Sequence, residues 1–372
     1  MTVVIKLGST LVVDGNGRVR RSLLAARAAE VAELVRAGEG VCIVSSGAIA
    51  LGLPRLGLAR RPRATPRLQA ASAVGQARLQ RAWDAALRAQ GLEAAQILLS
   101  APDLAERASY VNVRNALGTL LKLGVVPVVN ENDTTATDEI TFGDNDALAA
   151  QVAVLTRARL LVLLTEVEGV YTEHPAAAEA RLLAEGGRAD EAALGTAGSL
   201  GRGGMASKVA AARLAAAAGV PTVIASGKGP AVLSPILAGE RLGTRFAAQP
   251  SASASAFKLW LRYAKPVAGR LVVDAGAHSA LVAHGRSLLA VGVVGCEGEF
   301  AAGDAVELST RDGNVFAKGL VGVSAADVRG RPRGVEVVHR DRLVLYEAPL
   351  AVPTFRRAGS AGAPSETTGR AN

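Results

Sequence analysis

The sequence predicts an α/β protein: a three-layer αβα sandwich around a mainly parallel sheet, followed by a small, mostly β domain at the carboxyl end. Two observations predict this fold. Up to residue 246, short apolar runs alternate with longer segments rich in Ala and Leu, which is typical of a parallel sheet covered by helices on both faces. After residue 266, short apolar runs follow one another between Gly-rich turns, which is typical of a small β domain.

The alternation assigns the elements of the first part in chain order. Helices are placed where apolar residues recur with a helical period, and Gly38, Gly124 and Gly219 then end three of them. Strands are placed on the uninterrupted apolar runs. We therefore expect strands over Thr2–Leu7, Val41–Ser45, Ala95–Leu99, Val125–Asn130, Leu160–Thr165 and Thr222–Ser226, and helices over Ser22–Ala37, Leu68–Gln90, Tyr110–Leu123, Ala147–Thr156 and Ser207–Ala218.

Composition also sets the domain boundaries. The first domain takes residues 1–246. Residues 247–266 begin with the Ser/Ala/Pro stretch Ala247–Ala256, which has no periodicity and is interpreted as a linker. Residues 267–346 form the β domain, and 353–372 are rich in Gly, Ala, Ser and Thr, as in a disordered tail. In the β domain we expect strands over Leu271–Asp274, Leu288–Val294, Ala305–Thr310, Val315–Val323 and Val335–Arg340.

Composition and charge exclude several classes of protein. A chain that is 49% hydrophobic and 20% charged is not intrinsically disordered. No apolar run approaches the roughly 18 residues that span a bilayer, and the amino terminus lacks the pattern of a secretory signal. Cys42 and Cys296 have no CxxC or metal-ligand neighbour, so we expect two buried free thiols in a cytoplasmic protein. The net charge of +9 is spread over both parts of the chain, unlike a nucleic-acid footprint.

Polar and Gly-rich segments follow the first two predicted strands, at the sheet edge where α/β proteins bind ligands. Lys6 supplies a positive charge there, and Gly8 lets the backbone approach a phosphate. Ser46 and Gly47 could offer hydroxyl and amide donors to a carboxylate or phosphate. Taken alone, the first segment also fits an ordinary turn with a solvated lysine, and the second fits a helix cap.

Two clusters of amide and carboxylate side chains come next. Asn130 to Asp133 follow an expected strand, and Gly143 to Asp146 precede an expected helix. Such groups could hold an ammonium and a carboxylate together, or organise cationic catalysts. Turn formation is the alternative, because Asn, Asp and Gly are turn residues. A metal site is a second alternative, although the order of ligands is not that of an EF-hand.

Two later segments could bind a nucleotide. Leu163–Tyr171 leaves a strand and enters a turn whose backbone could contact a purine, or it is a plain strand and turn. Gly201–Lys208 combines glycines, free amides at a helix start and a lysine, which together form an anion cradle. Its alternative is a flexible loop, and it is not a Walker A loop because Ser207 precedes Lys208. Since only seven of the 42 basic residues are lysine, each lysine at such a position is informative.

None of the four histidines lies in a candidate site, so catalysis by a histidine base or a histidine-bound zinc is disfavoured. A nucleophile that is already ionised needs no general base. Attack of a carboxylate on ATP is such a reaction, and it requires positioning and charge neutralisation. Two lysines on different loops, with Mg²⁺ carried by ATP, would supply that neutralisation.

Seven segments occur in one order over about 230 residues: VVIKLGST, IVSSGAIALG, SAVGQARL, PVVNENDT, FGDNDALAA, LLTEVEGVY and GRGGMASK. Together they resemble the glutamate 5-kinases of the amino acid kinase family, and the β domain resembles a PUA domain. The resemblance covers residues 1 to about 345. It implies ATP-dependent phosphorylation of the side-chain carboxylate of L-glutamate to L-glutamyl 5-phosphate, the first step of proline biosynthesis.

The same resemblance implies roles for individual residues. Lys6 and Lys208 would contact the phosphates and stabilise the transition state, while Asp146 would hold the two lysines. L-Glutamate would be bound by Ser46, Asp133 and Asn145, with Asn130 as a helper. The ATP site would be lined by Lys6, Thr165, Glu166, Arg202, Gly203, Gly204, Met205, Ala206, Ser207 and Lys208.

The resemblance further implies that Mg²⁺ arrives with ATP rather than at a metal site of the protein. It implies a homo-oligomer, a dimer or a tetramer, and inhibition by proline at or overlapping the glutamate site. Two residues depart from the family: Glu166 stands where Asp is common, and Arg202 where Thr is common. Both departures concern the details of ATP binding.

Two other functions remain as alternatives. A related kinase could use a different acid acceptor. The protein could instead bind RNA through its PUA-like domain, but RNA is not an expected partner because the strands of that domain offer no aromatic stacking platform.

Overall fold

The computed structural model describes residues 1–135, 145–188, 204–249, 256–263, 265–330 and 334–346. The chain divides into two compact units, with the boundary between Val267 and Ala268. The expected tail, 353–372, and the middle of the expected linker, 250–255, lie outside the described residues.

The first unit is built on a seven-stranded sheet with the strand order β3-β4-β2-β1-β5-β6-β7. Neighbouring strands are parallel except β7, which runs antiparallel to β6 at one edge. The mainly parallel sheet is therefore confirmed, and β7 was not predicted. The bounds are β1 Thr2–Leu7, β2 Gly40–Ser45, β3 Ala94–Leu99, β4 Val126–Glu131, β5 Leu160–Thr165, β6 Thr222–Ser226 and β7 Thr244–Phe246.

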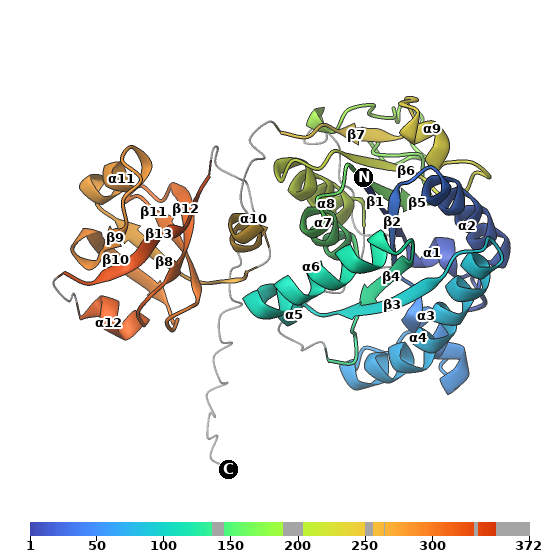
Figure 1. The fold of residues 1–372 in the computed structure, drawn as a ribbon, viewed down its shortest axis with the longest axis horizontal. Coiled ribbons are helices and arrows are strands. Elements are labelled where there is room, and N and C mark those ends of the chain that lie inside the picture. Colours follow the sequence, from blue (N-terminus) through green and yellow to red (C-terminus); the bar gives the residue numbers. More distant parts are fainter. Residues whose placement is uncertain (136–144, 189–203, 250–255, 264, 331–333, 347–372) are drawn as a thin grey trace, which may run out of the picture. The chain divides into compact units, whose positions relative to one another are not determined.

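Helices cover both faces of this sheet, so the three-layer arrangement is confirmed (Figure 1). One face is covered by α2 and α4, and the other by α6, α7 and α8. The long helices are α2 Arg21–Arg36, α4 Thr65–Arg88, α6 Arg107–Lys122, α7 Asn145–Thr156 and α8 Met205–Ala217. The short elements α1 Ser9–Val12, α3 Ala48–Gly52, η1 Leu53–Leu56, α5 Ala101–Ala105, η2 Gly186–Arg188 and α9 Leu233–Leu237 were not predicted.

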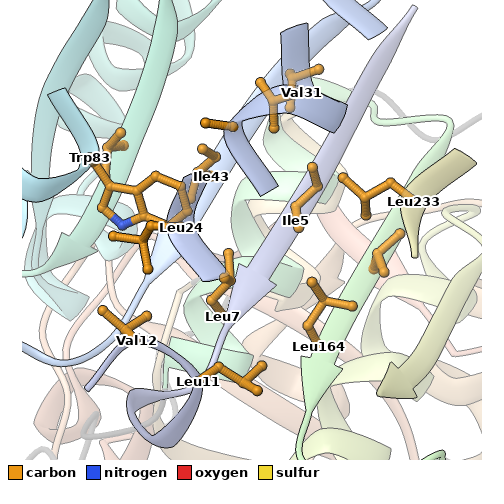
Figure 2. Close-up of a cluster of buried hydrophobic side chains, with 14 of the residues drawn as sticks. Ile5, Leu7, Leu11, Val12, Leu24, Val31, Ile43, Trp83, Leu164 and Leu233 are labelled. Carbon is orange, nitrogen blue, oxygen red and sulfur yellow. The ribbon is translucent and has the colours of Figure 1, made fainter. Parts of the chain in front are cut away.

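The core between the sheet and the α2/α4 layer decides which way the strand side chains point. Ile5 and Leu7 of β1 pack there against Leu24 of α2 and near Trp83 of α4 (Figure 2). Because successive side chains of a strand point to opposite faces, Lys6 must point to the other face. That face is the one covered by α7 and α8.

A close contact between α3 and α4 fixes the chain that follows β2. Gly75 of α4 lies so near the carbonyl oxygen of Ala48 that a Cβ there would clash with it, and Gly52 lies equally close to the carbonyl of Ala71. At the same place the indole Nε1 of Trp83 donates to Ser45 Oγ at 2.9 Å. These contacts hold the Ser-Ser-Gly turn against α4.

A further helix, α10 (Ala256–Tyr263), lies in the stretch expected to be a linker and belongs to the first unit. Trp260 is buried and donates its indole N–H to the carbonyl of Leu104 at 2.8 Å.

The boundaries 1–246, 247–266 and 267–346 stay predictions. No helix in the described part of the chain is long and apolar enough to cross a membrane.

The second unit contains a six-stranded sheet with the order β10-β8-β11-β12-β13-β9 and an apolar core around Leu271, Val306, Phe316 and Val338. Its elements are β8 Val267–Val273, α11 Ala275–Val282, β9 Leu288–Leu289, η3 Ala290–Gly292, β10 Val293–Gly298, β11 Ala305–Ser309, β12 Val315–Val321, α12 Ala325–Arg329 and β13 Glu336–Leu345.

Two sequence expectations are corrected in this unit. The single strand expected over Leu288–Val294 is wrong: a 3₁₀ turn separates β9 from β10 there, and at its end Gly292 packs so closely on Ala277 that a Cβ would clash. Only one of the two cysteine thiols is buried as expected. Cys42 is buried in β2, whereas Cys296 is half-buried.

Candidate active site

The carboxyl ends of β1, β2 and β5 meet at one edge of the sheet, since Leu7 is paired with Ser45 on one side and with Leu164 on the other. The segments singled out in the sequence therefore leave the sheet side by side. The polar residues that follow these strands face a common region, as expected for a ligand site in an α/β fold.

Three buried charged side chains of this edge form one cluster. Asp146, in the first turn of α7, contacts Lys6 Nζ through Oδ1 at 2.5 Å and Lys208 Nζ through Oδ2 at 3.0 Å. Lys6, Asp146 and Lys208 are 3%, 0% and 6% exposed. Two lysines separated by about 200 residues are therefore held on the two oxygens of one carboxylate.

The protonation of Asp146 follows from its neighbours. Burial by itself would raise the pKa of this carboxyl, but the ammonium groups of Lys6 and Lys208 outweigh burial and hold the pKa below its ordinary value. Asp146 is thus ionised at neutral pH. Two ammonium groups and one carboxylate leave one net positive charge in a buried site, which favours binding of an anion.

The start of α8 adds donors to this cluster. Lys208 lies in the first turn of the helix, and Ser207 Oγ donates to Asp146 Oδ2 at 3.2 Å. The first-turn amides of a helix point out of its amino end and carry partial positive charge. Of the predicted nucleotide contacts, Gly204, Met205, Ala206, Ser207 and Lys208 are at this helix start, whereas Arg202 and Gly203 lie outside the described residues.

A second, uncharged network lies beside the cationic cluster. Asn145 Nδ2 donates to Ser46 Oγ at 2.9 Å and to Asn130 Oδ1 at 3.1 Å. Asn130 Nδ2 in turn donates to Gln76 Oε1 at 2.8 Å. The side-chain oxygen of Asn145 is buried and has no hydrogen-bond partner among the described residues, so it can accept a hydrogen bond from a ligand.

Asp133 is tied to the same region through α4. Ser72 Oγ donates to Asp133 Oδ2 at 2.6 Å, and Ser72 lies one helical turn from Gln76. Both residues lie in the segment SAVGQARL, but no role was predicted for either from the sequence. Their spacing of four on the stripe that also contains the buried Leu68 and Leu79 was the available signal, because polar residues on a buried face need polar partners.

The remaining predicted nucleotide residues follow β5. The carbonyl of Thr165 accepts from Gly227 N at 2.8 Å, which joins the ends of β5 and β6. Glu166 is exposed, and its Oε1 lies 4.0 Å from Lys228 Nζ. Glu166 and Lys228 border a cavity of about 700 Å³ at the carboxyl edge of the sheet.

Consecutive residues join the two networks. Asn145 belongs to the uncharged network and Asp146 to the cationic cluster, so the networks meet in the first turn of α7. One set of groups suits a small polar molecule, and the other suits a polyanion next to it. Among the described residues no three His, Cys, Asp or Glu side chains form a group that could hold a metal ion.

Comparisons with known proteins match both parts of the chain. Residues 1–226 match the model of the amino acid kinase family, and residues 269–341 match that of the PUA domain. The chain is 45% identical over 361 residues to the glutamate 5-kinase of Thioalkalivibrio sulfidiphilus, a match that covers 92% of this chain and 96% of that protein. It is 46% identical over 362 residues to the glutamate 5-kinase of Chromohalobacter salexigens, covering 92% and 95%.

A solved structure, the UMP kinase of Bacillus anthracis, is more distant. It gives a TM-score of 0.46 at 17% identity and covers 68% of this chain and 96% of its own.

Proposed function

This chain belongs to the amino acid kinase family, and from that premise we propose that it transfers the γ-phosphoryl group of ATP to the side-chain carboxylate of L-glutamate. The products are L-glutamyl 5-phosphate and ADP, and the reaction is the first step of proline biosynthesis. The relatives that span nearly the whole chain are glutamate 5-kinases, whose name describes this reaction.

One observation supports the proposal above the others: the buried cluster of Lys6, Asp146 and Lys208 adjoins the uncharged network at Asn145. A kinase for a small carboxylic acid needs a cationic site for the γ-phosphoryl group directly beside a polar site for the acceptor. The sheet edge supplies both, joined through two consecutive residues of α7.

The chemistry needs little from the protein beyond position and charge. The glutamate side chain is ionised at neutral pH, so one carboxylate oxygen attacks the γ-phosphorus without a general base. The new P–O bond forms as the bond between the γ-phosphorus and the β,γ-bridging oxygen breaks, and ADP leaves with that electron pair. Lys6 and Lys208 stabilise the charge on the transferred group, and Asp146 keeps both ammonium groups in place.

L-Glutamate is bound by the uncharged network. Because Ser46 Oγ accepts from Asn145, its own hydroxyl hydrogen can be donated to a substrate carboxylate. The unpartnered oxygen of Asn145 and the carboxylate of Asp133 suit the substrate ammonium. Asn130 orients Asn145 through the hydrogen bond between them.

Mg-ATP is the second substrate. Its phosphates lie against Lys6, Lys208 and the start of α8, and its nucleoside part lies toward Thr165 and Glu166. We propose that Arg202 and Gly203, which precede α8 in the sequence, also contact ATP. The longer side chain of Glu166, relative to the aspartate common in the family, reaches an exposed position near Lys228 rather than the buried cluster.

Two further properties belong to the proposal. The protein assembles as a homo-oligomer, a dimer or a tetramer, and proline inhibits it by competing at or near the glutamate site. Sedimentation of the purified chain tests the first property. Initial rates at several glutamate concentrations with added proline test the second.

The proposal is tested by an assay of ADP formation with a panel of acceptors: L-glutamate, L-aspartate, N-acetyl-L-glutamate and UMP, each with Mg-ATP. We expect ADP only with L-glutamate. Turnover with another acid, and not with glutamate, would instead identify a related kinase with a different acceptor. Absence of turnover with every acceptor would refute the proposed function.

A further inference from the structure

A second buried ion pair lies at the sheet edge, apart from the Lys6–Asp146–Lys208 cluster. Arg27 and Glu30 are one turn apart on α2, and Arg27 Nε lies 2.9 Å from Glu30 Oε2. Arg27 is 1% exposed and Glu30 is 5% exposed. The remaining buried face of α2 is apolar, with residues such as Leu24 and Val31. Neither charge has a role in the function proposed above.

Both side chains bind the backbone of the loop that follows β6. Arg27 Nη2 donates to the carbonyls of Gly229 and Pro230 at 2.6 and 2.8 Å. Glu30 Oε1 accepts from the amides of Val232 and Leu233 at 2.5 and 2.7 Å. The pair therefore fixes both the donors and the acceptors of one loop, which we call the β6 loop and define as residues 227–233.

Stability alone gives a weak reason for such a pair. Burying two charges costs desolvation that their attraction often only offsets, and apolar residues of similar volume usually stabilise a helix equally well. In addition, the pair fixes the conformation of the loop, because its four hydrogen bonds to the backbone have a defined geometry. A loop held in this way positions whatever side chain it carries.

That side chain is Lys228, which precedes the two carbonyls bound by Arg27. Lys228 and Glu166 both border the cavity of about 700 Å³. The neighbouring Gly227 donates its backbone N–H to the carbonyl of Thr165. In the sheet β6 lies two strands from β1. Since neighbouring strands are about 4.8 Å apart, the end of β6 is roughly 10 Å from the end of β1, which carries Lys6.

We propose that Arg27 and Glu30 are positioning residues that hold the β6 loop so that Lys228 contacts ATP, at the end of the phosphate chain away from the transferred group. The inference rests on the function proposed above. Lys6 and Lys208 act on the γ-phosphoryl group, whereas Lys228 acts on binding of the nucleotide alone. It is also one of only seven lysines in a chain whose other basic residues are arginine.

The test compares three variants of the full chain with the wild type. Lys228→Ala removes the cation, Lys228→Arg retains it, and the double variant Arg27→Met/Glu30→Leu removes both buried charges together so that neither is left unpaired. We expect Lys228→Ala and the double variant each to raise the KM for ATP about threefold to tenfold, a typical loss for one charged contact. The kcat and the KM for glutamate should stay within about twofold, and Lys228→Arg should restore most of the loss.

Three further measurements separate positioning from folding. Lys122→Ala, which removes an exposed lysine in the last turn of α6, should leave every constant unchanged. A triple variant with Lys228→Ala, Arg27→Met and Glu30→Leu should raise the KM for ATP no further than Lys228→Ala alone. The reason is that Lys228→Ala and the double variant both remove the same contact, the one between Lys228 and ATP. Hydrogen exchange of the Val232 and Leu233 amides should accelerate in the double variant and not in Lys228→Ala.

The inference is overturned if the KM for ATP is unchanged in Lys228→Ala or in the double variant, or if the KM for glutamate rises by the same factor. A purely structural pair would lower the melting temperature of the double variant and leave the KM for ATP unchanged. Failure of the proposed function is seen separately, as a wild type that forms no ADP with glutamate. Binding of Mg-ATP measured by calorimetry without glutamate then tests Lys228 independently of turnover.

Discussion

The carboxylate of Asp146 offers the sharpest test of how the site is built. The substitution Asp146→Asn keeps the size of the side chain and removes its charge. In the wild type, the ammonium groups of Lys6 and Lys208 lie 2.5 and 3.0 Å from the carboxylate oxygens of Asp146. The neutral amide of the variant can no longer neutralise these two ammonium groups. The net charge of the cluster rises from +1 to +2 in a site that is almost fully buried.

The size of the effect follows from burial. Removing one partner of a buried ion pair costs about 3–5 kcal/mol, because the remaining charge is left uncompensated. At about 2–4 °C per kcal/mol for a unit of this size, a loss of about 3 kcal/mol lowers the melting temperature by about 6–12 °C. Because the two lysines are then no longer held, we expect kcat to fall by about 10²–10³.

The assay is thermal unfolding with and without Mg-ATP, combined with initial rates of ADP formation. ATP should stabilise Asp146→Asn more than the wild type, because its phosphates replace the missing negative charge. Asp84→Asn is the matched control: it removes an aspartate that is also paired on a helix, with Arg88 at 3.1 Å, but near the surface, and should change stability by no more than about 0.5 kcal/mol. An unaltered melting temperature and kcat in Asp146→Asn would refute the reasoning.

Three other predictions concern packing, pH and reactivity. Gly75→Ala places a methyl group against the carbonyl of Ala48, so it should displace α3 and raise the KM for glutamate about tenfold or more. Its control is Gly118→Ala in α6, where the new Cβ has no neighbour within 4 Å. That substitution should stabilise the protein by about 0.5–1 kcal/mol in denaturant titrations. Because the pKa of Asp146 is lowered on folding, its contribution to stability is present above 3.8 and is lost as the pH falls through the lower folded value. The difference in unfolding free energy between wild type and Asp146→Asn should therefore shrink below pH 3.8, and a constant difference down to pH 2 would contradict the ionised state. Burial raises the pKa of the Cys42 thiol to about 12, so mass-mapped alkylation at pH 8 should leave it unmodified until denaturant is added.

Much of the fold follows from the sequence because apolar periodicity is a strong signal. The uninterrupted runs at Thr2–Leu7, Leu160–Thr165 and Thr222–Ser226 match strands to the residue. Alternation along β1 also explains why Lys6, between two core residues, faces the opposite side from Ile5 and Leu7. The short helices escaped prediction because a single turn has no period to detect.

The site was only partly accessible from the sequence. Lys6, Asp146 and Lys208 were identified from their motifs, but their meeting point depends on how strands and helices pack. No role was predicted for Ser72 or Gln76, although the segment SAVGQARL contains both, because the sequence alone does not show which groups they face. Arg27 and Glu30 were missed for a related reason: a charged pair one turn apart on a helix is ordinarily solvent-exposed, and only the packing of the β6 loop buries it.

The most direct test of the account is to trap the product. An acyl phosphate reacts with hydroxylamine, so wild-type protein with L-glutamate, Mg-ATP and hydroxylamine should yield glutamyl hydroxamate and ADP in equal amounts. Lys208→Ala should lower the kcat of hydroxamate formation by about 10²–10³ and change the KM for glutamate little. ADP released without hydroxamate, or a Lys208→Ala variant that turns over at the wild-type rate, would contradict the claim that Lys6 and Lys208 together act on a phosphoryl group in transit to glutamate.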